Sequence, residues 1–210
     1  LITIDDCVFE KCRKLKEIQL SQNLKQIGFN AFYKTVPFND SSKVYNGCFY
    51  LGNHLIVAKT EDMLACPVRE GTKTIADGAF VSASRLQRVT LPEGLLTIGD
   101  SAFSHCDGLT SIVISNSVTS IGNYAFYGVE KMQRLTLPNS VKGIGMYAFK
   151  GWNGLTSIVI PSTVKSLDDN AFSYCDSLQE IIICEGITSF STTAFSGNSS
   201  LQRVSYPCSM

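Results

Sequence analysis

The stretch LTSIVISNSVTSIGNYAF, residues 109–126, decides the fold. It opens on Leu109 and places Ile112 and Ile114 at alternate positions among β-branched and polar residues, which predicts a short strand with one inward face. A turn follows, and the Gly-x-x-Ala-Phe segment that ends at Phe126 returns the chain on the far side. Ala beside Phe predicts a short helical or 3-10 turn there. One unit thus contains one strand and one compact turn.

The same pattern recurs along the chain at a fixed period. The sequence numbers of the phenylalanines that end these segments differ by 23, except for one difference of 48, and an alanine or valine precedes each of them. They are Phe9, Phe32, Phe80, Phe103, Phe126, Phe149, Phe172 and Phe195. Other apolar residues keep fixed offsets from these phenylalanines, so each unit presents apolar side chains to both neighbours. Such units fold only by stacking, which predicts a continuous core and parallel pairing of the strands.

Residues 33–74 break the period. Asn46-Gly47 and Gly52-Asn53 are dipeptides typical of hairpin turns, and they flank the apolar run at 48–51. A second apolar run at 54–57 follows. We predict an irregular double unit whose turn is rebuilt as a β-hairpin. Two interpretations stay open: sequence drift inside a repeat array, or a protruding element that recognises a partner.

The motif L-x-x-I-x-I-P followed by V-x-x-I-G-x-x-A-F, repeated at this period, resembles the BspA-like leucine-rich repeat family. The residues that carry the resemblance in one unit are Leu155, Ile158, Ile160, Pro161, Val164, Leu167, Ala171 and Phe172. The resemblance covers nearly the whole chain. It implies an α/β repeat fold over residues 1–210: a right-handed leucine-rich-repeat solenoid of about eight units, with a parallel β-sheet on the concave face and short helical or 3-10 turns on the convex side.

Members of this family are largely cell-surface or secreted proteins of host-associated bacteria and some protists, and several are adhesins or host-protein binders. The resemblance therefore implies a cell-surface or secreted protein that binds a protein or a glycan, with host extracellular matrix among the partners. It supplies no catalytic residues. The chain departs from the broader leucine-rich repeat pattern because no regular asparagine ladder follows the strand. The backbone groups of that turn must then find other partners.

Composition and charge argue against several classes of function. Lys and Arg total 18, as do Asp and Glu, so the chain lacks the basic field that nucleic-acid binding requires. No apolar run approaches the length of a transmembrane helix. The sequence begins at Leu1 without Met, so the absence of a leader does not bear on secretion. No phosphate-binding or dinucleotide-binding motif occurs, and no cofactor is predicted.

The eight cysteines form no C-x-x-C pair and have no histidine at ligand spacing, so no metal site is predicted. Cys48 and Cys66 both lie in the irregular segment and could either pair or stay reduced, and Cys208 lies near the C-terminus. Cys106 beside His105 could in principle act as a nucleophile. However, Cys106 shares its repeat position with small and apolar residues of other units, which indicates a packing role.

Acidic doublets occur at Asp5-Asp6 and Asp168-Asp169, in both cases just before the Ala-Phe or Val-Phe turn. A Ca²⁺ site requires more oxygen ligands at fixed offsets. We therefore predict that these carboxylates are solvated turn residues and form no acid/base pair. With no catalytic constellation anywhere in the chain, the protein is predicted not to be an enzyme.

The third and fifth positions of L-x-x-I-x-I point away from the core on each predicted strand. Stacked in register, they form one line of mainly β-branched residues beside another that contains spaced arginines. The residues predicted to bind a partner on the concave face are Arg88, Thr90, Val113, Arg134, Thr136, Val159, Glu180, Ile182 and Arg203. Because β-branched residues also suit strand surfaces in general, a purely structural role for these lines stays open.

The function predicted from the sequence is a non-enzymatic, adhesin-like interaction module that uses the concave sheet or the segment 33–74. The alternative is a structural spacer in a longer surface protein. The sequence starts part-way into a unit and stops just after a strand, without polar caps. Uncapped solenoid ends expose core residues, so self-association through the ends is also an expectation.

Overall fold

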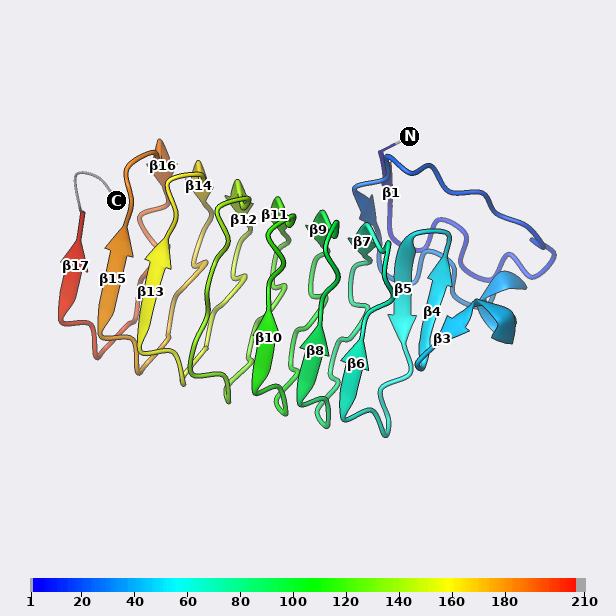
Figure 1. Cartoon of the computed structure of the whole chain (residues 1–210), viewed down its shortest axis with the longest axis horizontal. Coiled ribbons are helices and arrows are strands. Elements are labelled where there is room, and N and C mark those ends of the chain that lie inside the picture. The colour runs from blue at the N-terminus through cyan, green and yellow to red at the C-terminus, as the bar shows by residue number, and fades with distance from the viewer. Residues whose placement is uncertain (1, 207–210) are drawn as a thin grey trace.

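A computed structural model describes residues 2–206, and almost all of its regular structure is β. Coils of chain lie side by side along the long axis of the molecule (Figure 1). The helices among the described residues are two 3-10 turns in the irregular segment, η1 (Pro37–Asn39) and η2 (Ser41–Lys43). Cys208 lies outside the described residues.

Two sheets run along the stack, and we name them the back sheet and the front sheet. The back sheet contains, in spatial order, β16 (Ser189–Phe190), β14 (Ser166–Leu167), β12 (Gly143–Ile144), β11 (Ser120–Ile121), β9 (Thr97–Ile98), β7 (Thr74–Ile75), β5 (His54–Ala58), β4 (Cys48–Leu51) and β3 (Val44–Tyr45). The front sheet has two halves, one of β6 (Ala65–Pro67), β8 (Arg88–Thr90) and β10 (Ser111–Val113), the other of β13 (Ser157–Ile160), β15 (Glu180–Ile183) and β17 (Arg203–Ser205). Neighbouring strands are parallel except at β3–β4–β5, which are antiparallel.

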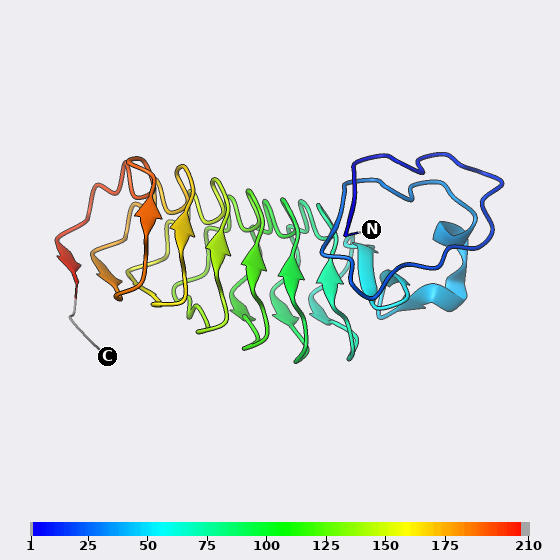
Figure 2. The ribbon, with the colours of Figure 1, turned by 90° about the horizontal axis from the view of Figure 1, so that it is seen from above.

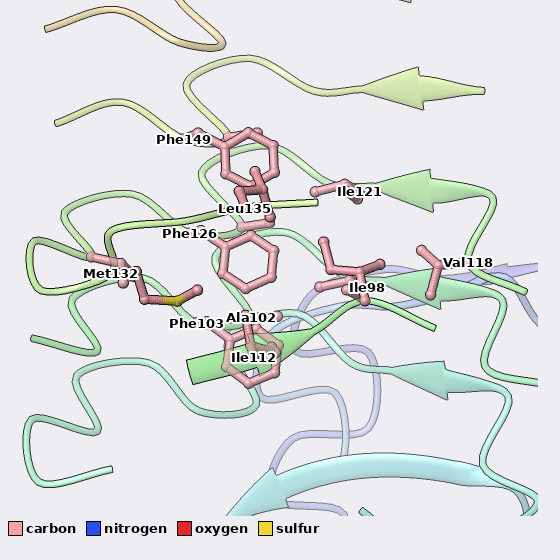
Figure 3. Close-up of a cluster of buried hydrophobic side chains, with 14 of the residues drawn as sticks. Ile98, Ala102, Phe103, Ile112, Val118, Ile121, Phe126, Met132, Leu135 and Phe149 are labelled. Atoms are coloured by element: carbon pink, nitrogen blue, oxygen red, sulfur yellow. The ribbon is translucent and has the colours of Figure 1, made fainter. Parts of the chain in front are cut away.

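The predicted internal column of phenylalanines is confirmed. From Phe80 to Phe195 the rings lie one on another, with centroid distances of 4.9, 5.1, 5.4, 4.8 and 5.7 Å and interplanar angles of at most 14°. Figure 3 shows part of the column, with Ile98 and Ile121 of the back sheet beside it. Burial of these rings and of the aliphatic columns supplies the main stabilisation, because one coil alone would leave both of its apolar faces in water.

The prediction of helical turns at the Ala-Phe segments is wrong. Each such segment is a series of hydrogen-bonded turns, and all but the last have two residues in the left-handed region, as at Tyr124 (φ 55°) and Gly128 (φ 71°). This geometry turns alternate N–H groups toward the next coil. The N–H of Phe126, for example, donates to the carbonyl of Ala148 at 2.8 Å. A helix would have used these donors within one coil and left the contact between coils without hydrogen bonds.

A ladder of Asp and Asn side chains lies just before these turns. The Oδ1 atom of Asp100 accepts from the backbone N–H of Asn123 at 2.8 Å, and Asn123 Oδ1 accepts from the N–H of Met146 at 2.9 Å. Asp77 likewise accepts from the N–H of Asp100 at 2.7 Å. The fold therefore does contain an Asx ladder, but it binds N–H groups that follow the back-sheet strands and not those of the turn after the front-sheet strands.

The glycine of Gly-x-x-Ala-Phe exists because of this ladder. A Cβ atom on Gly145 would lie 2.7 Å from both the backbone N and the Oδ1 of Asn123 in the preceding coil. A Cβ atom on Gly99 would likewise lie too close to Asp77, and one on Gly122 too close to Asp100. Where Met146 takes the place of the Asx residue, the next coil has Asp168 in place of glycine. Ser191 follows the coil of Asp169 and is an exception, because its hydroxyl donates to Asp169 Oδ1.

The acidic doublets belong to the same ladder. Asp6 Oδ1 accepts from the N–H of Phe29 at 2.7 Å, and Asp169 Oδ1 accepts from the Ser191 hydroxyl. The second member of each doublet thus bonds to the next coil, which corrects the expectation that both residues are simply solvated. Asp5 and Asp168 are exposed.

The hairpin of β4 and β5 is a wall between two separate cores. Phe49 and Leu51 of β4 pack against the core of residues 4–32, whereas Cys48 and Tyr50 pack against the core of the main stack. Phe9 and Phe32 stack on each other at 5.4 Å in the smaller core. Figure 2 shows the N-terminal coils beyond the hairpin at one end of the array. The hairpin therefore does not protrude, and the chain forms two stacks in place of one continuous one.

Asp77 lies where the two stacks meet, and it makes folding stability depend on pH. Burial raises the pKa of Asp77 to about 6, although Gln26 Nε2 donates to its Oδ2 at 2.9 Å. The folded state therefore holds this proton more tightly than the unfolded chain, whose carboxyl has the ordinary value of 3.8. Stability is expected to fall as the pH rises from about 4 to about 6, because unfolding then releases a proton.

The substitution Asp77→Asn should remove this dependence, because the amide keeps an acceptor for the N–H of Asp100 and does not ionise. Denaturant unfolding of both proteins at intervals between about pH 4 and about pH 7 measures the effect. We expect the variant to gain on the wild type through this window and to equal it at the acid end. Parallel stability curves would contradict the assignment.

Candidate partner-binding surface

Seven of the nine predicted binding residues lie on strands of the front sheet, and the other two, Arg134 and Thr136, lie in the segment between its halves. Arg88, Thr90, Val113, Arg134, Thr136, Val159 and Arg203 are exposed, and Glu180 and Ile182 are half-buried. Val113 stands out, since 74% of it is accessible to solvent, and Val159 is 41% accessible. The intervening residues Val89, Ile112 and Ile158 are buried, as alternation along a strand requires.

The predicted lines of outward residues are also in register within each half of the sheet. Arg88 lies opposite Ser111 and Thr90 opposite Val113 in the first half. In the second half, Glu180 pairs with Arg203 across neighbouring strands, and Val159 pairs with Ile182. The Arg203 Nε lies 3.5 Å from Glu180 Oε1, an exposed ion pair of little energetic weight.

Between the two halves, residues 131–137 form no strand. Within the part of the chain that the structure describes, no backbone hydrogen bond joins this segment to β10 on one side or to β13 on the other. Arg134 and Thr136 belong to this segment, so the sheet does not bring all nine residues together in one ladder. The main-chain donors and acceptors of 131–137 are left for solvent or for a partner.

Two depressions lie on either side of the unpaired segment. The first, of about 620 Å³, is lined among others by Val113, Arg134 and Lys131. The second, of about 670 Å³, is lined among others by Val159 and Glu185. Four of the nine predicted residues line these depressions: Val113, Arg134, Thr136 and Val159. Arg88, Thr90, Glu180, Ile182 and Arg203 do not line either depression.

Trp152 lies in the coil that follows the interruption of the sheet. This indole is fully buried and stacks on Phe126 and Phe149 with centroid distances of 6.1 and 5.2 Å. The other coils of the main stack have much smaller side chains at this repeat position, such as Cys106 and Cys175. Phe126 and Phe149 are 5.4 Å apart, wider than the flanking steps of 5.1 and 4.8 Å. We infer that the volume of the indole holds segment 131–137 away from its neighbours.

A second exposed feature is an aromatic ridge on the turn side, which we define as His105, Tyr124, Tyr127, Tyr147 and Tyr174. Tyr124 and Tyr147 stack at 4.9 Å, and His105 meets Tyr127 edge-on at 5.1 Å. The ammonium of Lys150 lies 5.0 Å from the ring centroids of both Tyr147 and Tyr174. Most of these ring faces are already occupied by one another or by the cation.

Four members of the ridge, His105, Tyr124, Tyr147 and Tyr174, have positive φ angles of 53–56°. Other coils place Gly78, Ser82 or Gly128 at the same repeat positions. A non-glycine residue in this region is strained by about 1 kcal/mol. Stacking and cation–π contacts offset part of this cost, so the ridge has a structural explanation within the chain.

The residues considered for catalysis do not form a site. Cys106 is buried, its thiol lies 3.2 Å from the carbonyl of Phe80, and burial raises the pKa of that thiol to about 12. His105, next in sequence, is exposed on the ridge. His54 is buried, with Nδ1 2.7 Å from Thr74 Oγ1 and Nε2 3.2 Å from the carbonyl of Ser21, and burial lowers its pKa.

Among residues 2–206, no three His, Cys, Asp or Glu side chains come together in a way that could hold a metal ion. The same part of the chain contains no helix with the length and hydropathy needed to cross a membrane.

Comparison with protein families gives a match to the model described as "BspA type Leucine rich repeat region", in six copies. The matches span residues 1–106, 42–134 and 97–210, and so include the whole chain. The chain belongs to this family. The family resemblance inferred from the motif is therefore confirmed. A search of curated proteins returns no match.

Solved structures of bacterial leucine-rich repeat proteins have the same fold as this BspA-type chain. The T. pallidum leucine-rich repeat protein is 24% identical with a TM-score of 0.59, and the alignment covers 96% of this chain and 72% of that one. The pneumococcal vaccine antigen PcpA is 25% identical with a TM-score of 0.65, over 92% of this chain and 57% of that one. A leucine-rich repeat protein from Bacteroides ovatus ATCC 8483 is 24% identical with a TM-score of 0.55, over 98% and 52%. The chain thus spans little more than half the length of the last two proteins.

Sequence reasoning missed several residues of this BspA-type surface. Lys131 and Asn116 line the first depression, and Glu185 and Cys184 line the second, yet none of them occupies an outward strand position. The unit of Met132 did carry a signal. It is the unit with Met in place of the first leucine, and the next unit contains the single tryptophan of the chain. Both substitutions mark the coil where the packing changes.

Proposed function

We propose that this BspA-type chain is a non-enzymatic interaction module of a cell-surface or secreted protein, and that it binds a protein partner, or a glycan, at the two depressions of the front sheet. One observation carries the proposal. Exposed Val113 and Val159, the cations Arg134 and Lys131, and unpaired main-chain groups meet around segment 131–137, and such a mixture is typical of protein interfaces.

The family and its relatives support an extracellular role. The description of one structural neighbour, PcpA, is that of a pneumococcal vaccine antigen. We propose that this chain is likewise part of a surface-exposed repeat protein. Host extracellular-matrix components are the first partners to test. The hairpin of residues 48–58 is a weaker candidate for the contact surface, because both of its faces are largely buried.

The variant Arg88→Thr, Arg134→Thr, Val159→Lys tests the front sheet. Binding to a panel of immobilised extracellular-matrix proteins and glycans is measured first for the wild type, then for the variant against whatever the wild type binds. We expect affinity to fall at least about 100-fold, as removal of interface anchors does, with an unchanged circular-dichroism spectrum.

A matched control is Lys142→Thr, which removes the same net charge from an exposed site next to the back sheet. Binding by the control should equal that of the wild type. If the triple variant binds as well as the control does, the front sheet is not the contact surface.

The second candidate function is a structural spacer in a longer surface protein. The unbroken ring column from Phe80 to Phe195 favours it, because such a column makes an extended body that resists bending. Flanking anchor or catalytic domains in the full-length gene product, together with no binding to the panel, would favour the spacer over the binding module.

Self-association is a further part of the proposal. In the last described coils, Phe190, Val204 and Tyr206 are 46%, 45% and 62% exposed, so apolar surface is available at that end of the stack. Sedimentation at several protein concentrations tests it, and a constant monomer mass would exclude it.

A further inference from the structure

Cys48 and Cys66 face each other inside the main stack. Cys48 belongs to β4 of the hairpin wall, and Cys66 belongs to β6, the first strand of the front sheet. Their Sγ atoms are 3.2 Å apart, and the two residues are 0% and 1% exposed. A disulfide bond would bring the sulfurs about 1.2 Å closer, a movement within reach of small side-chain rotations.

The other buried cysteines have a different arrangement. Cys106 and Cys175 each direct their Sγ toward the carbonyl of a phenylalanine in the preceding coil, at 3.2 and 3.3 Å. Asn198, at the same repeat position, does so with its Nδ2 at 3.0 Å. The thiol at this position therefore substitutes for another hydrogen-bond donor. Cys48 and Cys66 lie outside this pattern, and the sulfur of each has the sulfur of the other beside it.

We propose that Cys48 and Cys66 form an intrachain disulfide that fastens the hairpin wall to the front sheet. In the reaction two thiols are oxidised and lose two protons and two electrons, and an added disulfide of low molecular weight accepts the electrons and is reduced to two thiols. The sulfur–sulfur bond of that oxidant breaks, and the bond between Cys48 and Cys66 forms. The proposal is independent of what the front sheet binds.

The two thiols of the pair interact directly in the folded chain. The neighbouring thiol of Cys48 can donate to a thiolate at Cys66, and this lowers the pKa of Cys66 and raises that of Cys48. One of the two thiolates attacks the external disulfide to give a mixed disulfide, and the other cysteine then attacks the protein sulfur of that mixed disulfide and displaces the small thiol. Because both sulfurs are buried in the folded chain, exchange requires the wall to be open, as it is during folding.

The cross-link would close the connection between the wall and the first front strand. Cys48 and Cys66 are 18 residues apart, and the connection between β5 and β6 includes the exposed residues Lys59, Glu61 and Asp62. A closed loop of this length restricts the unfolded chain, so the oxidised protein should unfold about 5–10 °C higher than the reduced one.

Trypsin offers a direct test, because the chain can be cut after Lys43, Lys59 and Arg69. Cys48 is then alone in the peptide 44–59, and Cys66 is alone in the peptide 60–69. The full chain is refolded with oxidised and reduced glutathione, its free thiols are alkylated under denaturing conditions, and the digest is analysed by mass spectrometry. We expect these two peptides joined, with the mass of two hydrogens missing, and their separation on reduction.

Thiol counts and stability provide the second readout. The denatured oxidised chain should show six reactive thiols in place of eight, and reductant should lower its Tm. In the variant Cys48→Ala, Cys66→Ala, reductant should leave Tm unchanged, whereas Cys106→Ala should keep the wild-type response. Alkylated Cys48 and Cys66 after refolding with the oxidant, or these peptides joined to other cysteines, would overturn the proposal.

Discussion

Replacing Gly145 by alanine is expected to lower Tm by about 6–12 °C, the effect of roughly 3 kcal/mol on a domain of this size. A Cβ atom there would lie 2.7 Å from the backbone N and the Oδ1 of Asn123 and 2.8 Å from the backbone carbon of Gly122. The coils cannot separate to relieve the contact without breaking the hydrogen bond from Met146 to Asn123. Overpacking and a lost hydrogen bond therefore act together.

The control lies two residues earlier in the same coil. Gly143 is in β12, and a Cβ atom on it would have no heavy atom within 4 Å beyond its chain neighbours. Gly143→Ala should be neutral or slightly stabilising, because alanine restricts the unfolded chain. Thermal unfolding of the two variants compares them under one set of conditions. Equal Tm values would show that the ladder does not require glycine.

Replacing Trp152 by valine is expected to have two large effects in opposite directions. The protein should become less stable overall, while segment 131–137 should become better protected from hydrogen exchange. The indole is fully buried against the rings of Phe126 and Phe149, so its loss should cost about 3 kcal/mol in the free energy of unfolding. If the indole holds segment 131–137 out of the sheet, the smaller side chain should at the same time let that segment pair. Hydrogen exchange at its amides should then become slower while global stability falls.

In the wild type, the amides of 131–137 should exchange much faster than those of β13 and β15, because no strand partner protects them. Peptide-resolved hydrogen exchange on both proteins makes the comparison. Phe149→Val serves as the control, since it also removes a buried ring from the same region without emptying the Trp152 position. Unchanged hydrogen exchange at 131–137 in Trp152→Val would show that the indole does not cause the interruption of the sheet.

The stacking of coils could be predicted from sequence because it depends on equal spacing alone. Phe103, Phe126 and Phe149 lie in one column because each period of the sequence makes one coil. The outward direction of Val113 and Val159 followed from alternation along a strand, and it needed no knowledge of the turn. The binding role of these residues stays a prediction.

The turn conformation could not be predicted by the same means. Ala-Phe suggested a helix, but Tyr124 and Tyr147 adopt left-handed angles that tyrosine seldom adopts, and only the hydrogen bonds to the next coil explain why. The pairing of glycine with an Asx residue of the preceding coil was visible in part, since Gly122 follows a coil with Asp100 and Asp168 follows one with Met146, although Ser191 follows one with Asp169. This signal is a correlation between positions in successive units, so it cannot be seen within one unit alone.

The separation into two stacks escaped prediction because both stacks share one period. The hairpin turns were recognised, but nothing in the run from Cys48 to Leu51 shows that its two faces serve different cores. Likewise, the interruption at 131–137, which we attribute to the volume of Trp152 in the following unit, has no signal within its own unit that separates it from a strand. Such effects require knowledge of which side chains meet across coils.

Because β4 runs antiparallel to both of its neighbours, the two ends of the back sheet are not equivalent. A parallel coil can add to a neighbour indefinitely, since each new strand presents the same edge again. At the hairpin that succession stops: the back sheet finishes on β3, two residues long and antiparallel to its neighbour. Short terminal strands of this kind resist fibre-like growth. Extension of the back sheet by further parallel copies of the repeat is therefore blocked at β3.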